Sequence, residues 1–486
     1  MKLARNIIWN AIGIALPLLV GVAVVPAIVR GLGTERFGFL SIIWVLIGYF
    51  SVFDLGLGRT LTKLAADRLA EGREEQIAPL AWTTLITVAV TSTFVSVIVA
   101  LAAQWVAQIA LKHSPALVPE GTLAVLWLAI SLPFVLLATV LTGLLEAYQR
   151  FGLINAVRVP LGVLILAAPL AVLPFSRDLG VITAALAGIR ILNAAVLTAL
   201  ALRIVPALRH HLFVFRRELL RPLLTFGGWL TVSNVVGPLM VYFDRFLIAV
   251  VLGSAAIAYY TVPYDVLNRV LVLPTAMQAV LFPTFVMLLG QSSPRVVSVF
   301  GRSSETTMLL MAPVLLAVVL LAQQGLQLWV GETFAEKSAL TAKILAVGVL
   351  ANAMARSPFV FIQAANKANW TAILHMIELP LYAIALWLLL RSDGIEGAAY
   401  AWSGRVIIDT LVLYLMTARI EPRLTRTAMR DLSWVVGACI LAVALDWSLR
   451  EVSVRIAATL LLGLACGIGL MLYVSGSRPA LANRNT

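Results

Sequence analysis

Five arginines lie inside long apolar stretches of this 486-residue chain. An arginine stays protonated, and placing one at the centre of a bilayer costs about 2.5 to 3.5 kcal/mol. Its guanidinium makes forked, charge-assisted hydrogen bonds to phosphate oxygens. We therefore expect a water-filled, positively charged cavity between helices and an anionic cargo. The five residues are Arg190, Arg245, Arg269, Arg356 and Arg405.

The elements that must position these arginines are membrane-spanning helices. The chain is 61% hydrophobic and only 12% charged, and its mean hydropathy is +0.98. Apolar runs recur along its length, each close to the ~20 residues that cross a bilayer as a helix. We expect an all-α polytopic membrane protein with about 14 transmembrane helices, of which the run 256–289 is too long for one straight span. The runs are 7–29, 38–57, 82–110, 122–146, 154–174, 180–202, 223–250, 256–289, 304–326, 340–364, 370–391, 394–417, 432–449 and 453–474.

Basic residues outnumber acidic residues by 36 to 23, and their placement indicates an orientation. Most loop arginines and lysines fall on the side of Met1, which the positive-inside rule makes cytoplasmic. Both termini are then expected in the cytoplasm. The excess of positive charge therefore mostly reflects the orientation of the helices in the membrane, and no nucleic-acid partner is expected. The strongest clusters are Arg59/Lys63/Arg68/Arg73, Arg203/Arg209/Arg216/Arg217/Arg221 and Arg419/Arg423/Arg426/Arg430.

Several function classes are disfavoured. A membrane polymerase or ligase usually needs a large external loop, and no expected loop is longer than roughly 25 residues beside helices of about 20. No G-x-x-x-x-G-K-[ST] motif is present, so the chain is not expected to use ATP by itself. Cys439 and Cys466 both lie in apolar runs, which argues against a disulfide framework or a zinc site. We expect no metal and no cofactor.

The chain contains an internal repeat. Residues 31–38 and 251–258 each read Leu-Gly, a short polar turn, and then small and apolar residues that open the next helix. Six helices per half give parallel repeats, with the cargo site expected between the lobes. The expected parts are an N-terminal lobe (1–202), a basic cytoplasmic connector (203–222), a C-terminal lobe (223–417) and an appended helix pair with the tail (418–486).

Several short phrases carry a family resemblance. They are Asn6-Ile7-Ile8-Trp9-Asn10, Arg30-Gly31-Leu32-Gly33, Phe53-Asp54-Leu55-Gly56-Leu57-Gly58-Arg59 and Tyr242-Phe243-Asp244-Arg245. In these phrases the chain resembles the polysaccharide-export (Wzx-type) flippases of the multidrug/oligosaccharidyl-lipid/polysaccharide exporter superfamily.

This resemblance implies a function and a fold. It implies a MATE/MurJ-like fold whose two six-helix lobes rock between inward-open and outward-open states. It implies the translocation of undecaprenyl-pyrophosphate-linked oligosaccharides from the inner to the outer leaflet of a bacterial inner membrane, for O-antigen or other surface polysaccharide. One departure is the helix number, because many members of this type have twelve helices, whereas the lipid II flippases of the superfamily have fourteen.

Four of the buried arginines are candidate ligands of the cargo diphosphate. Arg190 and Arg356 have no acidic residue three or four positions away, so neither has a partner on its own helix. Arg269 follows Asp265 by four residues, and Arg405 precedes Asp409 by four. Such spacing also permits ion pairs along one helix. Pairing with carboxylates is therefore the structural alternative for all four arginines, Arg190, Arg269, Arg356 and Arg405.

Charged residues near the membrane faces are candidates for gates. Asp54 and Arg59 end the second run near the cytoplasm, where an inner gate and a capped helix end are the two interpretations. Arg30, Asp244 and Arg245 lie toward the outer face, where they could hold the diphosphate or close an outer gate. A fixed salt bridge between the lobes is the alternative.

His375 and Glu378 share one helix face in an apolar stretch. Histidine titrates near neutral pH, so the pair is a candidate for proton coupling, with a hydrogen-bonded buried pair as the alternative. The candidate coupling ions are H⁺ and Na⁺. The expected partners are the lipid-linked oligosaccharide, the bilayer, and the polysaccharide polymerase with its chain-length machinery. The remaining functional alternatives are a cation-coupled multidrug exporter, a lipid II flippase and a polysaccharide polymerase or ligase.

Overall fold

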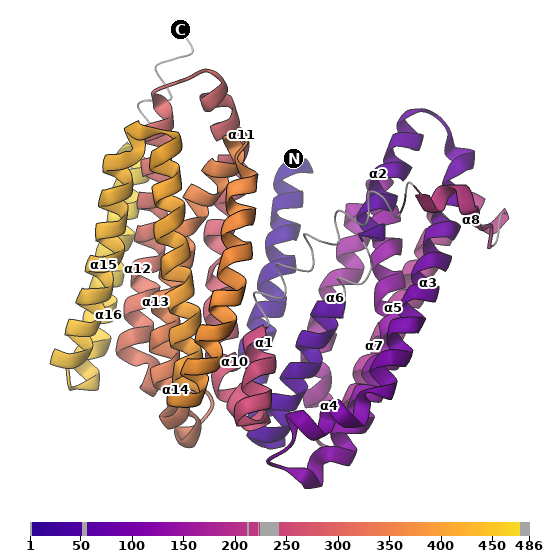
Figure 1. Ribbon diagram of the computed structural model, residues 1–486, viewed down its shortest axis with the longest axis horizontal. Coiled ribbons are helices and arrows are strands. Elements are labelled where there is room, and N and C mark those ends of the chain that lie inside the picture. Colours follow the sequence, from indigo (N-terminus) through magenta and orange to yellow (C-terminus); the bar gives the residue numbers. More distant parts are fainter. Residues whose placement is uncertain (1, 51–55, 211–212, 222, 224–242, 477–486) are drawn as a thin grey trace. The chain divides into compact units, whose positions relative to one another are not determined.

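The computed structural model describes residues 2–50, 56–210, 213–221, 223 and 243–476. Within these ranges the chain is helical throughout apart from turns, which confirms the expected all-α class (Figure 1). Contacts divide the chain into two compact units, Met1–Ala258 and Tyr259–Thr486. The division falls inside helix α10 and not in the basic connector 203–222.

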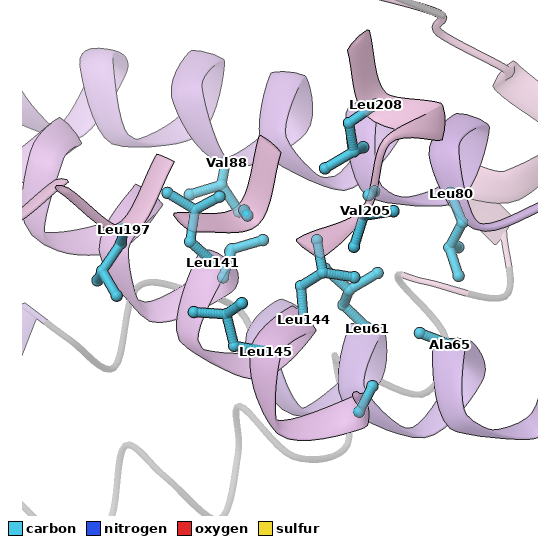
Figure 2. Close-up of a cluster of buried hydrophobic side chains, with 14 of the residues drawn as sticks. Leu61, Ala65, Leu80, Val88, Leu141, Leu144, Leu145, Leu197, Val205 and Leu208 are labelled. Carbon is cyan, nitrogen blue, oxygen red and sulfur yellow. The ribbon is translucent and has the colours of Figure 1, made fainter. Parts of the chain in front are cut away.

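The first unit is built around α5, which packs against α2, α3, α4 and α7, while α1 packs on α6. Leucine and valine side chains of α2, α3, α5 and α7, among them Leu61, Val88, Leu141 and Leu197, form one buried cluster (Figure 2). The helices of this unit are α1 (Lys2–Phe50), α2 (Leu57–Ala70), α3 (Ile77–Leu101), α4 (Ala103–Ala110), α5 (Val118–Ala147), α6 (Phe151–Val172), α7 (Leu179–Ile204), α8 (Ala207–His210) and residues 243–252, with 3₁₀ turns η2 (Glu74–Gln76), η3 (Pro115–Leu117) and η4 (Arg217–Leu219).

The second unit is built around α13, which packs against α11, α12 and α14. Of the 18 residues in the most apolar stretch of α13, 72% are buried. In the corresponding stretch of α16, 0% are buried. The apolar surface of α16 is therefore left for lipid. The helices are α10 (Ser254–Val270), α11 (Val272–Gly290), α12 (Arg295–Trp329), α13 (Glu332–Ala364), α14 (Ala368–Ile420), α15 (Thr425–Ser448) and α16 (Val452–Gly476), with the 3₁₀ turn η5 (Pro422–Leu424).

Nine helices among the described residues are long and apolar enough to cross a membrane, or ten if one bent pair counts as a span. The expected number of fourteen stays a prediction. Two helices each run through two of the expected runs: α1 breaks at Gly33 (φ 80°, ψ 163°) and α14 at Gly394 (φ 61°, ψ −135°). As expected, the run 256–289 is not one straight span: α10 ends at Val270, and the segments Ser254–Thr275 and Val280–Gly290 are inclined to each other by 42°.

The internal repeat has a structural counterpart. Gly33 and Gly253 both have positive φ, 80° and 89°, a conformation that glycine adopts without strain. Each lies at the end of a helical arm, as a C-terminal glycine does. At the second turn, Lys112 donates hydrogen bonds to the carbonyls of Val250 and Val251. A positive charge at the C-terminal end of a helix stabilises it, because it interacts favourably with the helix dipole. The repeated Leu-Gly motif therefore marks the same helix-ending turn twice.

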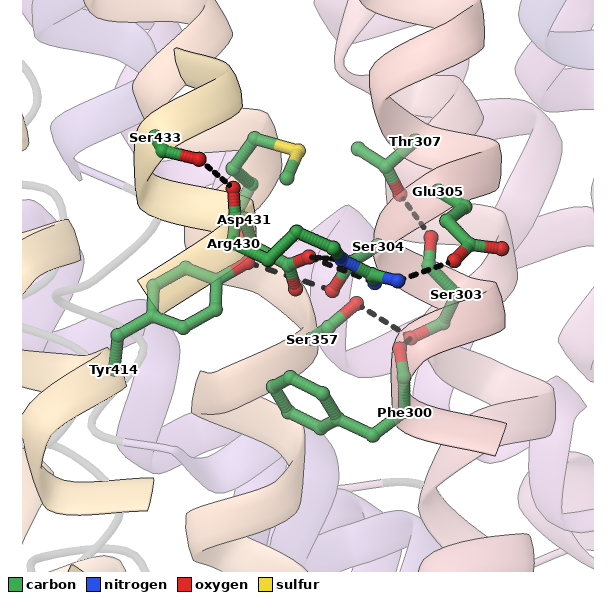
Figure 3. A network of polar contacts seen from close by, with 11 residues as sticks. Phe300, Ser303, Ser304, Glu305, Thr307, Ser357, Tyr414, Arg430, Asp431 and Ser433 are labelled. Atoms are coloured by element: carbon green, nitrogen blue, oxygen red, sulfur yellow. Dashed lines mark hydrogen bonds and ion pairs between the residues drawn. The ribbon is translucent and has the colours of Figure 1, made fainter. Parts of the chain in front are cut away.

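The appended helix α15 is fixed to α12 by a polar network (Figure 3). Arg430 of α15 donates to Glu305 of α12 at 2.7 Å and to Asp431 at 3.0 Å. Asp431 is fully buried. Buried charges need such partners, because an unpaired one costs several kcal/mol. The appended helix pair is thus an integral part of the second unit.

Candidate functional site

The first unit contains a polar cavity of about 440 Å³. Three arginines from three helices line it: Arg59 of α2, Arg158 of α6 and Arg190 of α7. Among the described residues of its lining, the only acidic one is Glu146 of α5. The hydrogen-bonding groups of Thr62, Thr139, Thr142 and Asn193 complete the polar wall. A cavity with this lining suits an anion that also carries hydroxyl groups.

Arg190 is the most enclosed of the three arginines, with 4% of its surface exposed. It lies on α7, a helix whose first turn is capped by Asp178, the acceptor of the Val181 N–H. Among the described residues, the Nη1 atom of Arg190 has no hydrogen-bond partner, and neither has Oδ1 of Asn193 in the same wall. Buried polar atoms are nearly always hydrogen-bonded. These two atoms are therefore free to bind a polar ligand.

Arg59 is held at the cavity by a close packing of α2 on α5. Thr62 donates to the carbonyls of Gly58 and Gly143, at 3.0 and 2.9 Å. A methyl group on Gly143 would lie 2.5 Å from the Gly58 carbonyl oxygen, so only glycine allows this approach. Arg59, one residue after Gly58, is thereby positioned by the α2–α5 contact.

The sequence analysis missed Arg158 and Glu146. Both are near the ends of apolar runs, where charged side chains ordinarily reach toward water. Sequence gives no sign that α5 and α6 turn these two residues toward the same cavity as Arg190.

Arg405 and His375 lie in the second unit, and each has its ion-pair partner on the opposite arm of α14. Spacing along one helix face permits pairs of Arg405 with Asp409 and of His375 with Glu378, and the ligand atoms of His375 and Glu378 do lie within 4.8 Å of each other. The structure pairs Arg405 Nη1 with Glu378 Oε2 at 3.6 Å, and His375 Nε2 with Asp409 Oδ1 at 3.7 Å. The reason is the break at Gly394, which turns α14 into two arms and brings residues of one arm against residues of the other.

The other two candidate arginines of the second unit are Arg356 and Arg269. Arg356 of α13 interacts electrostatically with Asp409, and its Nε atom has no hydrogen-bond partner. Its carbonyl accepts a hydrogen bond from Gln278 at 3.4 Å. Arg269 is half-buried near the end of α10, and none of the ion pairs that the structure describes includes it.

Four of the five candidate gate residues, Arg30, Arg59, Asp244 and Arg245, are described in the first unit. Asp244 and Arg245 are both buried, and the backbone N–H of Arg245 donates to Asp244 Oδ1 at 2.8 Å. Arg30 is exposed on α1, before the break at Gly33. Asp54 lies outside the described residues. Among the four candidates that the structure describes, only Arg59 lines the polar cavity.

A second cavity, of about 530 Å³, lies in the second unit between α12, α15 and α16. Apart from Glu305 and Ser433, its walls are almost wholly apolar, with Leu309, Leu441 and Leu462 among them. It offers no cation to a phosphate. The polar cavity around Arg190 is therefore the better candidate site for an anionic cargo.

Long apolar helices in two helical units, with arginines around a polar cavity, define a multi-pass membrane protein. Residues 3–289 match the family model described as "Polysaccharide biosynthesis protein". The chain is also 30% identical over 424 residues to a Shigella flexneri protein described as "Putative O-antigen transporter", covering 86% of this chain and 98% of that one. The chain belongs to the polysaccharide biosynthesis protein family.

Two solved structures share the fold of this chain. The lipid II flippase MurJ in an inward closed conformation matches with a TM-score of 0.70 at 12% identity, covering 98% of this chain and 100% of that one. An inward-facing MATE multidrug resistance transporter of the MOP superfamily also has a TM-score of 0.70, at 14% identity, with 84% and 95% covered. The expected MATE/MurJ-like fold is confirmed.

Proposed function

We propose that this protein is a flippase for undecaprenyl-pyrophosphate-linked oligosaccharides. It moves them from the inner to the outer leaflet of the bacterial inner membrane by alternating access, for surface polysaccharide synthesis. No covalent bond changes, so the protein is a transporter and not an enzyme. Both termini are cytoplasmic, and H⁺ or Na⁺ is the coupling ion. The family match and the Shigella relative support this class of cargo.

The observation that carries the proposal is the cavity lined by Arg59, Arg158 and Arg190. A diphosphate is the part of a lipid-linked oligosaccharide that a guanidinium recognises best. The unbonded Nη1 of Arg190 is a donor for it. The threonines and Asn193 of the same wall can bond sugar hydroxyls. The prenyl chain stays in lipid, because its burial in a polar cavity would cost free energy.

Arg356, Arg405 and Arg269 of the second unit are proposed to receive the cargo at a later stage. Two of them are already close to carboxylates, Arg405 to Glu378 and Arg356 to Asp409. A diphosphate must compete with these carboxylates, so binding there is expected to be weaker than at Arg190. Such a gradient of affinity favours release. Asp54, Arg59, Asp244, Arg245 and Arg30 are proposed as the gates.

The other functions are less well supported. A cation exporter needs an acidic cavity, whereas three arginines face one glutamate here. A lipid II flippase would carry the same diphosphate with another sugar unit, so the cavity does not separate it from the leading proposal. The polymerase and the chain-length machinery remain proposed partners.

The proposal is tested in cells that lack the chromosomal gene and carry variants on a plasmid. Arg190→Gln removes the charge and keeps a hydrogen-bonding side chain, and we expect surface polysaccharide to fall at least tenfold. Arg203→Gln is the matched control, because Arg203 is exposed near the end of the same helix. Membrane levels of each variant are measured by blot. Normal polysaccharide in the Arg190→Gln strain would contradict the proposal.

The same strains separate a flippase from a polymerase. A flippase defect leaves lipid-linked single units in the inner leaflet, where membrane-impermeant reagents added outside do not reach them. A polymerase defect leaves single units in the outer leaflet. We expect the Arg190→Gln strain to accumulate the protected, inner-leaflet form.

A further inference from the structure

Three potential metal ligands meet between the two arms of α14. They are His375 and Glu378 on the arm before Gly394 and Asp409 on the arm after it. One ligand atom from each of the three lies within 4.8 Å of the other two. His375 Nε2 and Asp409 Oδ1 are 3.7 Å apart.

Three carboxylate oxygens of this cluster accept no hydrogen bond from the part of the chain that the structure describes. Glu378 has 6% of its surface exposed, and neither Oε1 nor Oε2 has a hydrogen-bond partner; Oδ1 of Asp409 has none either. Arg405 is an ion-pair neighbour of Glu378, but 3.6 Å is too long for a hydrogen bond. Hydrogen-bonded ion pairs in the same chain have much shorter N–O distances, 2.7 Å both for Arg36 with Glu120 and for Arg430 with Glu305.

From this geometry we infer that His375, Glu378 and Asp409 form a binding site for a divalent transition-metal ion of the Zn²⁺ class. An imidazole nitrogen with two carboxylates suits zinc and similar ions, whereas Mg²⁺ and Ca²⁺ prefer oxygen ligands alone. Three protein ligands leave a fourth position for water or another small ligand.

The distances fit such an ion after a small adjustment. With metal–ligand bonds of roughly 2.1 Å, ligand atoms in a tetrahedral site are about 3.4 Å apart. The His375–Asp409 pair is nearly at this separation, and the Glu378 oxygen, which lies within 4.8 Å of both other ligand atoms, must move closer. The side chain of His375 is 32% exposed, so the protein does not fully enclose the cluster.

Two positive side chains compete with the ion. Arg405 faces Glu378 from the same arm as Asp409, and Arg356 of α13 interacts with Asp409. Phe359 stacks on the ring of His375, and Tyr382 lies under the Arg405 guanidinium. Binding therefore requires Arg405 to turn away from Glu378. The bound ion would join the two arms of α14 and hold the hairpin closed, independently of any cargo.

The test is zinc binding to the purified full-length protein with a histidine-free affinity tag. The protein is stripped with a chelator, exposed to Zn²⁺ alone, and desalted before the zinc is counted by mass spectrometry. We expect one zinc per chain in the wild type. His375→Gln, Glu378→Gln and Asp409→Asn are each expected to weaken the affinity roughly tenfold or more, since losing even the partner of a metal ligand has effects of that size.

Two further variants make the result specific. His113→Gln is the matched control, because His113 is an exposed loop histidine far along the chain from the site, and it should bind zinc like the wild type. Arg405→Gln removes the competing charge and should bind zinc more tightly. This gain of affinity does not depend on whether a ligand variant folds well. Absence of bound zinc in both the wild type and Arg405→Gln, or equal binding in all ligand variants, would overturn the inference.

Discussion

Gly38 of α1 lies directly against the backbone of Ser254, the first residue of α10: a methyl group on Gly38 would be 1.7 Å from the Ser254 carbonyl oxygen. Gly38 ends the first copy of the repeated motif, and Ser254 belongs to the second copy. The two Leu-Gly turns are therefore in contact with each other inside the first unit. Only a glycine at position 38 permits this approach.

Gly38→Ala is expected to destabilise the protein strongly. The new methyl group meets a backbone atom that cannot rotate away, and overpacking of this kind costs about 1 to 3 kcal/mol or more. The measurement is the melting temperature of the purified protein in detergent. Gly188→Ala on α7 is the control, since nothing lies within 4 Å of its added methyl group. Equal melting temperatures for the two variants would show that the two turns do not touch.

Gly143→Ala is expected to reduce surface polysaccharide more than it reduces protein level. Its methyl group would push the Gly58 carbonyl away and with it the first turn of α2, which carries Arg59. Gly152→Ala, which has open space around it, serves as the control. Polysaccharide per amount of protein in the membrane is the quantity to compare. An unchanged ratio for Gly143→Ala would remove Arg59 from the proposed site.

Arg158→Gln is expected to lower surface polysaccharide, by a smaller factor than Arg190→Gln. Arg158 lines the same cavity but is exposed, so water partly replaces its interaction with an anion. Exposed charge pairs are typically worth about 0.2 to 1 kcal/mol, which is at most a few-fold in binding. A loss as large as that of Arg190→Gln would show that Arg158 is desolvated when cargo binds.

Arg430→Ala is expected to loosen α15 from α12. It leaves Asp431 buried without its cation. Because Arg430 itself is 37% exposed, we expect a cost between about 1 kcal/mol, as for an exposed pair, and about 3 to 5 kcal/mol, as for a fully buried one. Arg426→Ala, one turn earlier and exposed, should cost almost nothing. The measurement is the rate at which a membrane-permeant maleimide labels Cys439 on α15, which should rise only in Arg430→Ala. Equal rates in both variants would contradict the role of this network.

The features that could be predicted from the sequence are those that a single helix determines by itself. Arg190 was recognisable because it interrupts an apolar run, and the turns at Gly33 and Gly253 were recognisable because their motif repeats. These signals lie in local composition and local backbone conformation. They predicted the all-helical fold and one of the three arginines of the cavity as a cargo ligand.

The pairing of helices was beyond the same reasoning. Spacing along one helix suggested His375 with Glu378, yet the hairpin at Gly394 brings Asp409 to His375. Arg158 and Glu146 share a cavity with Arg190 only because α5, α6 and α7 pack together. The packing of helices against one another decides whether a charged side chain lines a cavity or faces away from it. A single sequence does not contain this information.

The most direct test of the central claim is translocation by the purified protein in liposomes. A lipid-linked oligosaccharide is placed in both leaflets, and its transfer is followed by the fraction that a membrane-impermeant glycosidase can reach. We predict transfer by the wild type and by Arg203→Gln, and a loss of at least tenfold with Arg190→Gln. Equal transfer by wild type and Arg190→Gln would contradict the claim that the Arg190 cavity binds the cargo diphosphate.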